Sequence, residues 1–322
     1  MNNLFLLASF IISVKSWHQV NDSAATKLDA ICGTSEQGVQ HPSTISLSYN
    51  HYGNQKMCNG ALITFRHILT AAHCLVDLDT YVNSGQCQVP KKQRRTPEIE
   101  PLDGWSVTYN GQNLNPVVAE AKMSPKYDAC LYSNDIAVLE LDQDILFDNA
   151  LPICLPDGLK FALSNEAILS CYTAVDPLQP SQQELMVANY VGVNKDPEKQ
   201  AIMVSDDSKP DYPDGTPLAQ YDKQSRQVNI GILRQRTSKI VVRSKGQRVE
   251  VTDLIFEDVR YAADWIHEVT GDKGSHWHRQ ESPARSHQSG DRYQLKDKKD
   301  DNHAASPFFL SLVVIALWAS TL

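Results

Sequence analysis

Apolar residues between positions 31 and 270 occur in short runs that are rich in β-branched side chains and separated by Pro, Asn, Asp and Gly. Examples are residues 44–48, 61–63, 136–141 and 239–242. Repeated short apolar runs with turn residues between them are typical of strands in a barrel or a sandwich. The pattern therefore predicts an all-β body.

One segment near the end of this body has a different period. Residues 256–269 place apolar side chains three and four positions apart, which predicts a helix. The stripe consists of Val259, Ala262, Ala263, Ile266 and Val269, with Tyr261 and Trp265 beside it. The sequence thus predicts an antiparallel β-body followed by a C-terminal helix.

The N-terminal segment has the pattern of a secretory signal. Residues 4–14 are apolar but too few to span a bilayer, and Val14 and Ser16 stand where a signal peptidase reads small residues. We expect residues 1–16 to be a signal peptide and the protein to enter the secretory pathway. The triplet at Asn21 matches the glycosylation pattern, which is a weak motif on its own.

The C-terminal segment predicts a tether. Residues 271–306 are polar with almost no aliphatic side chains, which is typical of a flexible stalk, and residues 307–322 are apolar. This tail is shorter than the ~20 residues of a spanning helix and no basic residue follows it. It favours a GPI-attachment signal over a short membrane anchor. Attachment to the outer cell surface would then be the only membrane contact.

The net charge, a basic run and the histidines of the stalk add little to the predicted function. The formal net charge of −8 argues against nucleic acid as the main partner. We interpret the basic run at Lys91, Lys92, Arg94 and Arg95 as a solvated loop. Histidines in the stalk are too irregularly spaced to predict a metal site, and no cofactor is expected; they are His276, His278, His287 and His303.

Two segments resemble the catalytic parts of the trypsin/chymotrypsin-like serine peptidase family. Residues 58–74 end in Thr-Ala-Ala-His-Cys and resemble the segment that carries the catalytic histidine, here His73. Residues 134–141 resemble the strand that carries the catalytic aspartate, here Asp135. Residues 151–156 and 261–266 resemble the interbarrel linker and the closing helix, so that the resemblance covers residues 31–270.

The resemblance implies a fold of two six-stranded antiparallel barrels with a C-terminal helix and an active site between the barrels. In this family the aspartate orients the histidine and stabilises its charged form. Seven cysteines in a secreted chain imply disulfides and one remaining thiol. The family pattern implies Cys58–Cys74, Cys87–Cys130 and Cys32–Cys154, and leaves Cys171 as the odd thiol.

The third catalytic position differs from the family. The nucleophile segment of the family, Gly-Asp-Ser-Gly-Gly-Pro-Leu, is best matched by residues 212–218, which places Asp214 where the serine belongs. Tyr212 replaces a glycine that helps to form the oxyanion hole, and Pro213 replaces the aspartate that receives the new N-terminal amine on activation. Ala30 stands before residue 31, where activation would need Arg or Lys.

These replacements predict a site that does not catalyse acyl transfer. A carboxylate opposes the negative charge that develops in the transition state, and loss of the nucleophile costs about six orders of magnitude in turnover in related enzymes. If Asp135 and Asp214 both flank His73, its pKa is expected to be raised. Arg234 and Arg236, in the strand that would hold substrate, are expected to crowd or recharge the cleft.

A second alignment leaves another function open. Residues 207–210 read Asp-Ser-Lys-Pro, so that Ser208 could be a displaced nucleophile after an insertion. Lys209 would then replace a glycine that often needs unusual backbone angles. The two hypotheses are a non-catalytic homologue that binds a protein or peptide, and a working endopeptidase that uses His73, Asp135 and Ser208.

Overall fold

The computed structural model describes residues 17–34, 43–51, 53–109, 112–114, 116–145, 150–174, 183–208, 211–243 and 246–272. The predicted signal peptide, the C-terminal tail and nearly all of the predicted stalk lie outside these residues, as does Lys209. No helix among the described residues is long and apolar enough to cross a membrane.

The first half of the chain forms one antiparallel sheet of seven strands in the order β5-β4-β1-β2-β3-β7-β6. Its strands are β1 (Thr44–His51), β2 (Asn54–Leu62), β3 (His67–Thr70), β4 (Trp105–Tyr109), β5 (Gln112–Asn113), β6 (Val118–Met123) and β7 (Ala137–Leu141).

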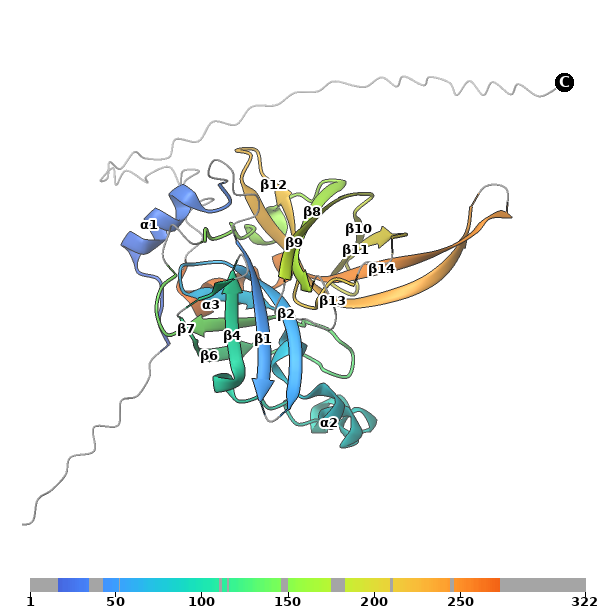
Figure 1. Cartoon of the computed structure of the whole chain (residues 1–322), viewed down its shortest axis with the longest axis horizontal. Helices are drawn as coiled ribbons and strands as arrows, with labels where there is room; N and C mark the ends of the chain where they lie inside the picture. The colour runs from blue at the N-terminus through green and yellow to red at the C-terminus, as the bar shows by residue number, and fades with distance from the viewer. Residues whose placement is uncertain are drawn as a thin grey trace, which may run out of the picture. The chain divides into compact units, whose positions relative to one another are not determined.

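The second half forms another antiparallel seven-stranded sheet in the order β10-β11-β14-β13-β12-β8-β9. Its strands are β8 (Glu166–Ala174), β9 (Gln183–Val191), β10 (Asn194–Asp196), β11 (Ala201–Asp206), β12 (Pro217–Tyr221), β13 (Gln227–Val242) and β14 (Arg248–Asp258). The far ends of β13 and β14 project from the body as a long hairpin (Figure 1).

The predicted fold class is confirmed: the described residues are mostly β, arranged in two antiparallel sheets with a short C-terminal helix. Each sheet contains six longer strands and one very short one, where the resemblance implied six. The additional strands are β5 and β10, with two and three residues. So few residues show no alternation of polar and apolar side chains, and the sequence pattern could not predict them.

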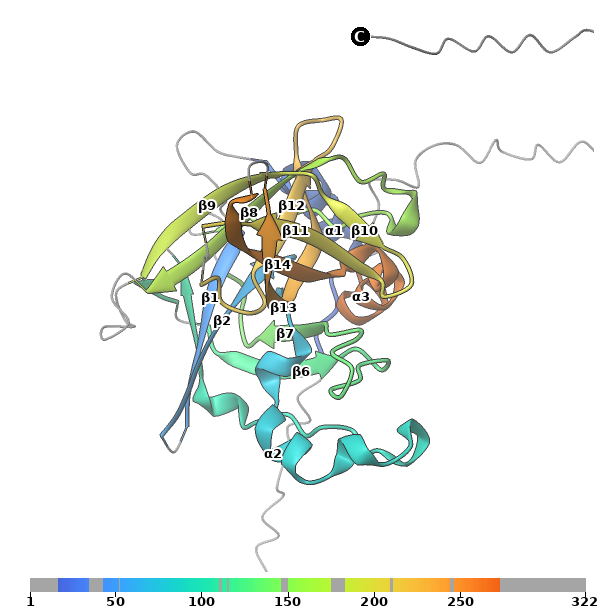
Figure 2. The same ribbon diagram turned by 90° about the vertical axis from the view of Figure 1, so that its right-hand side faces the viewer.

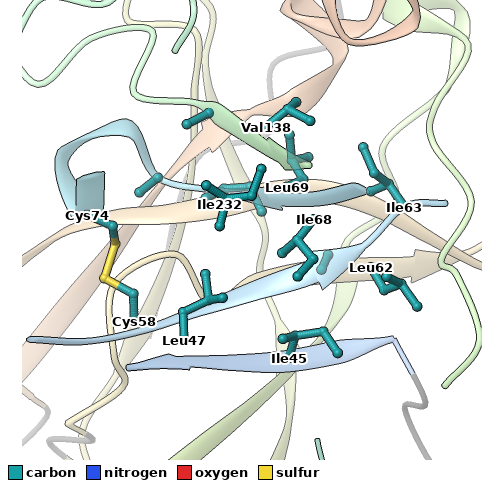
Figure 3. Close-up of a cluster of buried hydrophobic side chains, with 14 of the residues drawn as sticks. Ile45, Leu47, Cys58, Leu62, Ile63, Ile68, Leu69, Cys74, Val138 and Ile232 are labelled. Atoms are coloured by element: carbon teal, nitrogen blue, oxygen red, sulfur yellow. A yellow bond between two sulfur atoms is a disulfide. The ribbon is translucent and has the colours of Figure 1, made fainter. Parts of the chain in front are cut away.

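Buried aliphatic side chains hold each sheet together. In the first sheet, Ile45, Leu47, Leu62 and Ile68 are fully buried beside the Cys58–Cys74 disulfide (Figure 3). Ile232, from the second sheet, belongs to the same cluster. The two sheets therefore share a packed boundary rather than meeting only through a linker.

The C-terminal helix is shorter than the periodicity predicted. Residues 256–258 end strand β14, Val259–Tyr261 form a 3₁₀ turn, and helix α3 covers Ala263–Thr270. Asp258 accepts a hydrogen bond from the backbone N–H of Arg260 and so caps the turn that separates strand from helix. Ile266 and Val269 still point into the first core, as the stripe predicted.

The segment before residue 31 packs against this body. Helix α1 (Asp22–Ile31) is preceded by residues 17–20, in which the Trp17 indole donates to Val269 O at 2.6 Å and Val20 N donates to Thr270 O at 2.8 Å. The Trp17 ring stacks on the buried His67 ring with centroids 5.6 Å apart. The first and last described segments therefore hold each other in place.

Three disulfides are present, and they are the pairs that the resemblance implied. Cys32–Cys154 ties the end of α1 to the segment between the sheets, Cys58–Cys74 joins β2 to the histidine turn, and Cys87–Cys130 closes the excursion after α2 (Leu78–Asn83). Cys171 on β8 is a buried free thiol.

Candidate functional site

His73 lies in a tight turn directly after strand β3. The turn Ala72–Leu75 follows Thr70, and Cys74 in it is bonded to Cys58 on β2. Thr70 Oγ1 donates to the backbone carbonyl of Asn59 at 2.7 Å and so holds the end of β3 against β2. The histidine is thus fixed from both sides of the turn.

Asp135 is fully buried just before strand β7 and makes two contacts with His73. Its Oδ1 accepts from the backbone N–H of His73 at 2.8 Å, and its Oδ2 lies 2.6 Å from His73 Nδ1. Because a carboxylate only accepts hydrogen bonds, Nδ1 must carry the proton. The structure therefore brings together the first two predicted site residues in the expected arrangement.

Asp214 reaches the same histidine from the second half of the chain. Its backbone carbonyl accepts from Asn59 N at 2.8 Å, and its Oδ2 lies 3.1 Å from His73 Nε2. Gly215 follows with φ +78°, where a Cβ atom would lie 2.2 Å from Asn59 O, so that only glycine allows this close approach. The carboxylate of Asp214 thus contacts the ring nitrogen of His73 that Asp135 does not contact.

Two carboxylates on one imidazole fix its charge. Burial lowers the pKa of His73, but Asp135 and Asp214 outweigh this effect by charge and hydrogen bonding and raise the pKa to about 10. Both ring nitrogens then donate, Nδ1 to Asp135 and Nε2 to Asp214. At neutral pH the ring is an imidazolium and has no lone pair with which to accept a proton.

Arg236 on β13 covers the outer side of Asp214. Its guanidinium donates to Asp211 Oδ1 at 2.8 Å, to the backbone carbonyl of Tyr212, and to Asp214 Oδ1 at 3.4 Å. Asp214 is therefore held between two cations, Arg236 and the charged His73. Arg236 thus places a positive charge beside the histidine site, where the sequence analysis expected an arginine to crowd or recharge the cleft.

Arg234 is buried and does not crowd the histidine site, contrary to the expectation for both arginines. Its side chain is 6% exposed and is paired with Glu257 on β14, whose side chain is 3% exposed. The pairing register between β13 and β14 shifts from Leu233 to Gln235, so that Arg234 is the extra residue of a bulge. A bulge re-aims a side chain, and here it turns Arg234 into the interior.

Glu257 links this buried pair to the histidine site, and the sequence analysis missed it. Its Oε2 accepts from Arg234 and also from the backbone N–H of Asp135 at 3.2 Å. Burial raises the pKa of Glu257 to about 7, against the opposing effect of the Arg234 cation. The described residues thus form a continuous series of charged groups from Arg234 through Glu257, Asp135, His73 and Asp214 to Arg236, in which the two adjacent carboxylates, Glu257 and Asp135, are joined through the backbone N–H of Asp135.

Comparison of the sequence with known proteins shows to which family the chain is similar. A family model described as Trypsin matches residues 30–208, which is more than half of the chain. The chain belongs to the trypsin family. The matched residues include His73 and Asp135 and end before Asp214.

Individual relatives in the trypsin family match over a limited part of their length. The chain is 34% identical to the proclotting enzyme of Tachypleus tridentatus over 110 residues, which is 31% of this chain and 25% of that protein. It is 33% identical to serine protease grass of Drosophila melanogaster over 120 residues, 35% of this chain and 31% of the relative. With the venom protease of Bombus pensylvanicus it is 28% identical over 121 residues, 36% and 44% of the two chains. The chain therefore matches less than half the length of each of these relatives.

Tyr212, at the position where the trypsin family resemblance places a glycine, is part of the second core. Its ring is buried, and its hydroxyl lies 2.9 Å from that of Tyr190, which donates to the carboxylate of Asp206. Pro213, the next residue, has no backbone N–H. The turn before Asp214 is therefore anchored by a buried aromatic side chain that a glycine could not provide.

Ser208, the alternative nucleophile, lies exposed after the end of β11. Its hydroxyl and backbone N–H both donate to Asp206 Oδ1, the latter at 2.7 Å. Since both ring nitrogens of His73 are engaged by Asp135 and Asp214, Ser208 does not share a hydrogen bond with His73. The structure thus brings together His73, Asp135 and Asp214, while Ser208 bonds to Asp206 instead.

A metal centre is not part of this arrangement. Within the portion of the chain that the structure describes, no three His, Cys, Asp or Glu side chains are grouped in a way that could hold a metal ion.

Proposed function

We propose that this chain is a trypsin family homologue that does not hydrolyse peptide bonds and that acts by binding a protein or peptide. The observation that carries the proposal is the 3.1 Å contact between Asp214 Oδ2 and His73 Nε2. In an active member of the family, the atom at this position is a hydroxyl that gives its proton to the histidine. Asp214 has no proton to give.

Three further features oppose catalysis. A charged His73 cannot act as a general base, because its second ring nitrogen already carries a proton. The negative charge of Asp214 lies where the tetrahedral intermediate would need positive or hydrogen-bonding groups. Arg236 covers Asp214 and contacts the carbonyl of Tyr212, so that a substrate would have to displace it.

The outer edge of β13 supports the binding half of the proposal. Strand β12 pairs with β13 from Gln227 to Ile232, and among the described residues no strand pairs with that edge farther along the projecting hairpin (Figure 1). Unpaired strand edges accept an extended chain by main-chain hydrogen bonds. Ile240 and Val242, 68% and 63% exposed, would contact its apolar side chains. An extended peptide segment is therefore the ligand that fits.

The proposed setting is extracellular. Three disulfides are typical of proteins that fold in the oxidising secretory pathway. The proposal includes removal of the signal peptide, residues 1–16. It also includes attachment to the outer cell surface beyond the polar stalk, residues 271–306, directed by the apolar tail at residues 307–322, as a GPI signal in preference to a short membrane anchor.

The test is covalent labelling of the purified protein with a serine-directed fluorophosphonate, with trypsin as the positive control. We expect no labelling, because the residue at the nucleophile position has no hydroxyl. A Ser208→Ala variant is treated in parallel. Labelling that disappears in this variant would show that Ser208 is the nucleophile, and that the protein is an endopeptidase with His73, Asp135 and Ser208.

A further inference from the structure

The basic run in the sequence folds into a rigid surface loop, residues 90–95, which we call the basic loop. Pro90 precedes a 3₁₀ turn at Lys91–Gln93, and the backbone of Gln93 donates to Pro90 O at 2.8 Å. Figures 1 and 2 show α2, and Figure 2 also the turns after it, at the end of the molecule opposite to β12. The loop therefore lies apart from the second sheet and its projecting hairpin.

Arg94 is the anchor of the basic loop. Its Nη1 lies 2.9 and 3.1 Å from the two carboxylate oxygens of the buried Asp128, and its Nε donates to Val89 O at 3.2 Å. The Cys87–Cys130 disulfide joins the same two segments of chain. A buried charge pair beside a disulfide fixes the loop, so that its backbone is ordered before any ligand arrives.

Arg95 and Lys92 present their cations to solvent. The backbone N–H of Arg95 donates to Gln86 Oε1 at 2.9 Å and its carbonyl accepts from Tyr81 OH at 2.7 Å, while the side chain is exposed. Among the ion pairs of the described residues, none involves Lys92 or Arg95. Glu98, the nearest exposed acidic residue along the chain, does not pair with them.

Lys91 adds a third exposed cation. Its side chain is 65% exposed, and its ammonium lies 3.3 Å from Asp128, a carboxylate that Arg94 already engages. The loop therefore carries four cations, of which Arg94 and Lys91 contact the one buried carboxylate, and Lys91, Lys92 and Arg95 are exposed. The whole chain has a net charge of −8, so that this loop is a local exception and not part of a generally basic surface.

We propose that the basic loop binds a sulfated polysaccharide through Lys91, Lys92 and Arg95. Sulfate groups keep their charge at neutral pH and repeat along a linear chain, which suits several exposed cations on a fixed backbone. Two basic pairs separated by one residue form the kind of short Lys/Arg-rich run associated with heparin or nucleic acid.

The surroundings favour the polysaccharide over nucleic acid. Residues 88–96 contain no aromatic side chain on which a base could stack, and the adjacent Tyr81 is partly buried with its hydroxyl bonded to Arg95 O. The disulfides are typical of the extracellular compartment, where sulfated polysaccharides occur and nucleic acids are scarce. The inference is independent of the catalytic state of the histidine site, because no residue of the basic loop contacts that site among the described hydrogen bonds and ion pairs.

The experiment measures the affinity of the purified protein for heparin as a function of NaCl concentration. We expect the double variant Lys92→Ala/Arg95→Ala to lose roughly 10-fold or more in affinity at low salt, and the slope of log affinity against log salt to fall by about two. The control is Lys195→Ala/Lys223→Ala, which removes two exposed cations elsewhere. It is expected to bind like the wild type.

Two results would overturn the inference. An equal loss of affinity in both double variants would mean that only net charge matters. Equal affinity for heparin, for desulfated heparin and for duplex DNA of the same length would mean that the loop does not select sulfated sugar. Unchanged thermal unfolding of both variants checks that neither substitution acts through the fold, which the exposed positions of all four side chains predict.

Discussion

The two sheets contribute to the histidine site in different ways. The first provides His73 and Asp135 from neighbouring segments, and a single carboxylate fixes both the ring and the backbone of the histidine. The second provides a carboxylate, Asp214, and a guanidinium, Arg236, and places a buried ion pair behind Asp135. The match to the trypsin family covers the first contribution and ends before the second begins.

Under the proposed function, this difference means that the histidine–aspartate pair has persisted without the reaction it serves in active members of the family. The pair joins the turn after β3 to the start of β7, and it stabilises the first sheet whatever faces the other ring nitrogen. Fold alone does not establish activity, because activity depends on the particular groups of the site. In this chain the second half supplies the groups that contact the other ring nitrogen of His73 and its partner, Asp214 and Arg236.

The largest expected effect concerns the buried pair in the second sheet. Glu257→Ala would leave Arg234 buried without a partner, which should lower the free energy of unfolding by about 3–5 kcal/mol. The exposed pair Lys239–Asp253 is the control, and Lys239→Ala should cost at most about 1 kcal/mol. Urea unfolding of the two variants makes the comparison. Similar losses would show that Glu257 is not buried with Arg234.

The contribution of His73 to the free energy of unfolding should depend on pH in a way that other groups do not reproduce. Its folded pKa of about 10 lies above the ordinary value of 6.5, so its contribution is complete below pH 6.5 and is lost as pH rises through about 10. Between pH 7 and pH 9 we expect a decrease of about 2–3 kcal/mol that is absent in His73→Gln. A His73 titration by NMR with a midpoint near or below about 6.5 would contradict the geometry.

Removing one of the two carboxylates that contact His73 should lower the pKa of the histidine without returning it fully to its ordinary value. Asp214→Asn leaves Asp135 in place, and we expect the pKa of His73 to fall by about 1–2 units when followed by NMR. Asp211→Asn is the matched control, since Asp211 pairs with Arg236 but does not contact His73. An equal decrease of the His73 pKa in both variants would show that Asp214 has no specific contact with the ring.

The smallest expected effect is a null result. Asp214→Ser introduces a hydroxyl but leaves Tyr212 in the second core and Arg236 bonded to Asp211 and to the Tyr212 carbonyl, so that turnover of a fluorogenic peptide should stay within about tenfold of the Asp214→Ala variant. Adding Arg236→Gly and Tyr212→Gly tests which part still blocks the reaction. A single substitution that restores turnover would show that the rest of the site is already competent.

The sequence predicted the first half of the site more completely than the second. His73 and Asp135 lie in local motifs, so that neighbouring residues alone were enough to locate them. The alignment of residues 212–218 placed Asp214 at the nucleophile position, from which a contact with His73 was considered. The expected charged state of His73 followed from that placement.

The buried position of Arg234 and the role of Glu257 could not be predicted in the same way. They depend on the bulge at Arg234, which changes the side-chain alternation of β13 by one residue. Glu257 follows the apolar Phe256 in a strand, and nothing local marks it as the partner of a residue 23 positions away.

The start of the C-terminal helix was also predicted too early in the sequence. Strand pairing of Phe256 with Leu233 overrides the helical period of residues 256–269.

The single free thiol, Cys171, allows local opening of the second sheet to be measured separately from the rest of the protein. Cys171 is fully buried on β8, and burial raises the pKa of its thiol to about 12, so that it is neither accessible nor nucleophilic in the folded protein. A thiol reagent can therefore modify it only when β8 separates from its neighbours, and the rate of modification reports how often this happens. The other six cysteines are bonded and do not react. Cys171 thus serves as an intrinsic chemical probe of the opening of the second sheet, which also contains Arg234, Arg236 and Glu257.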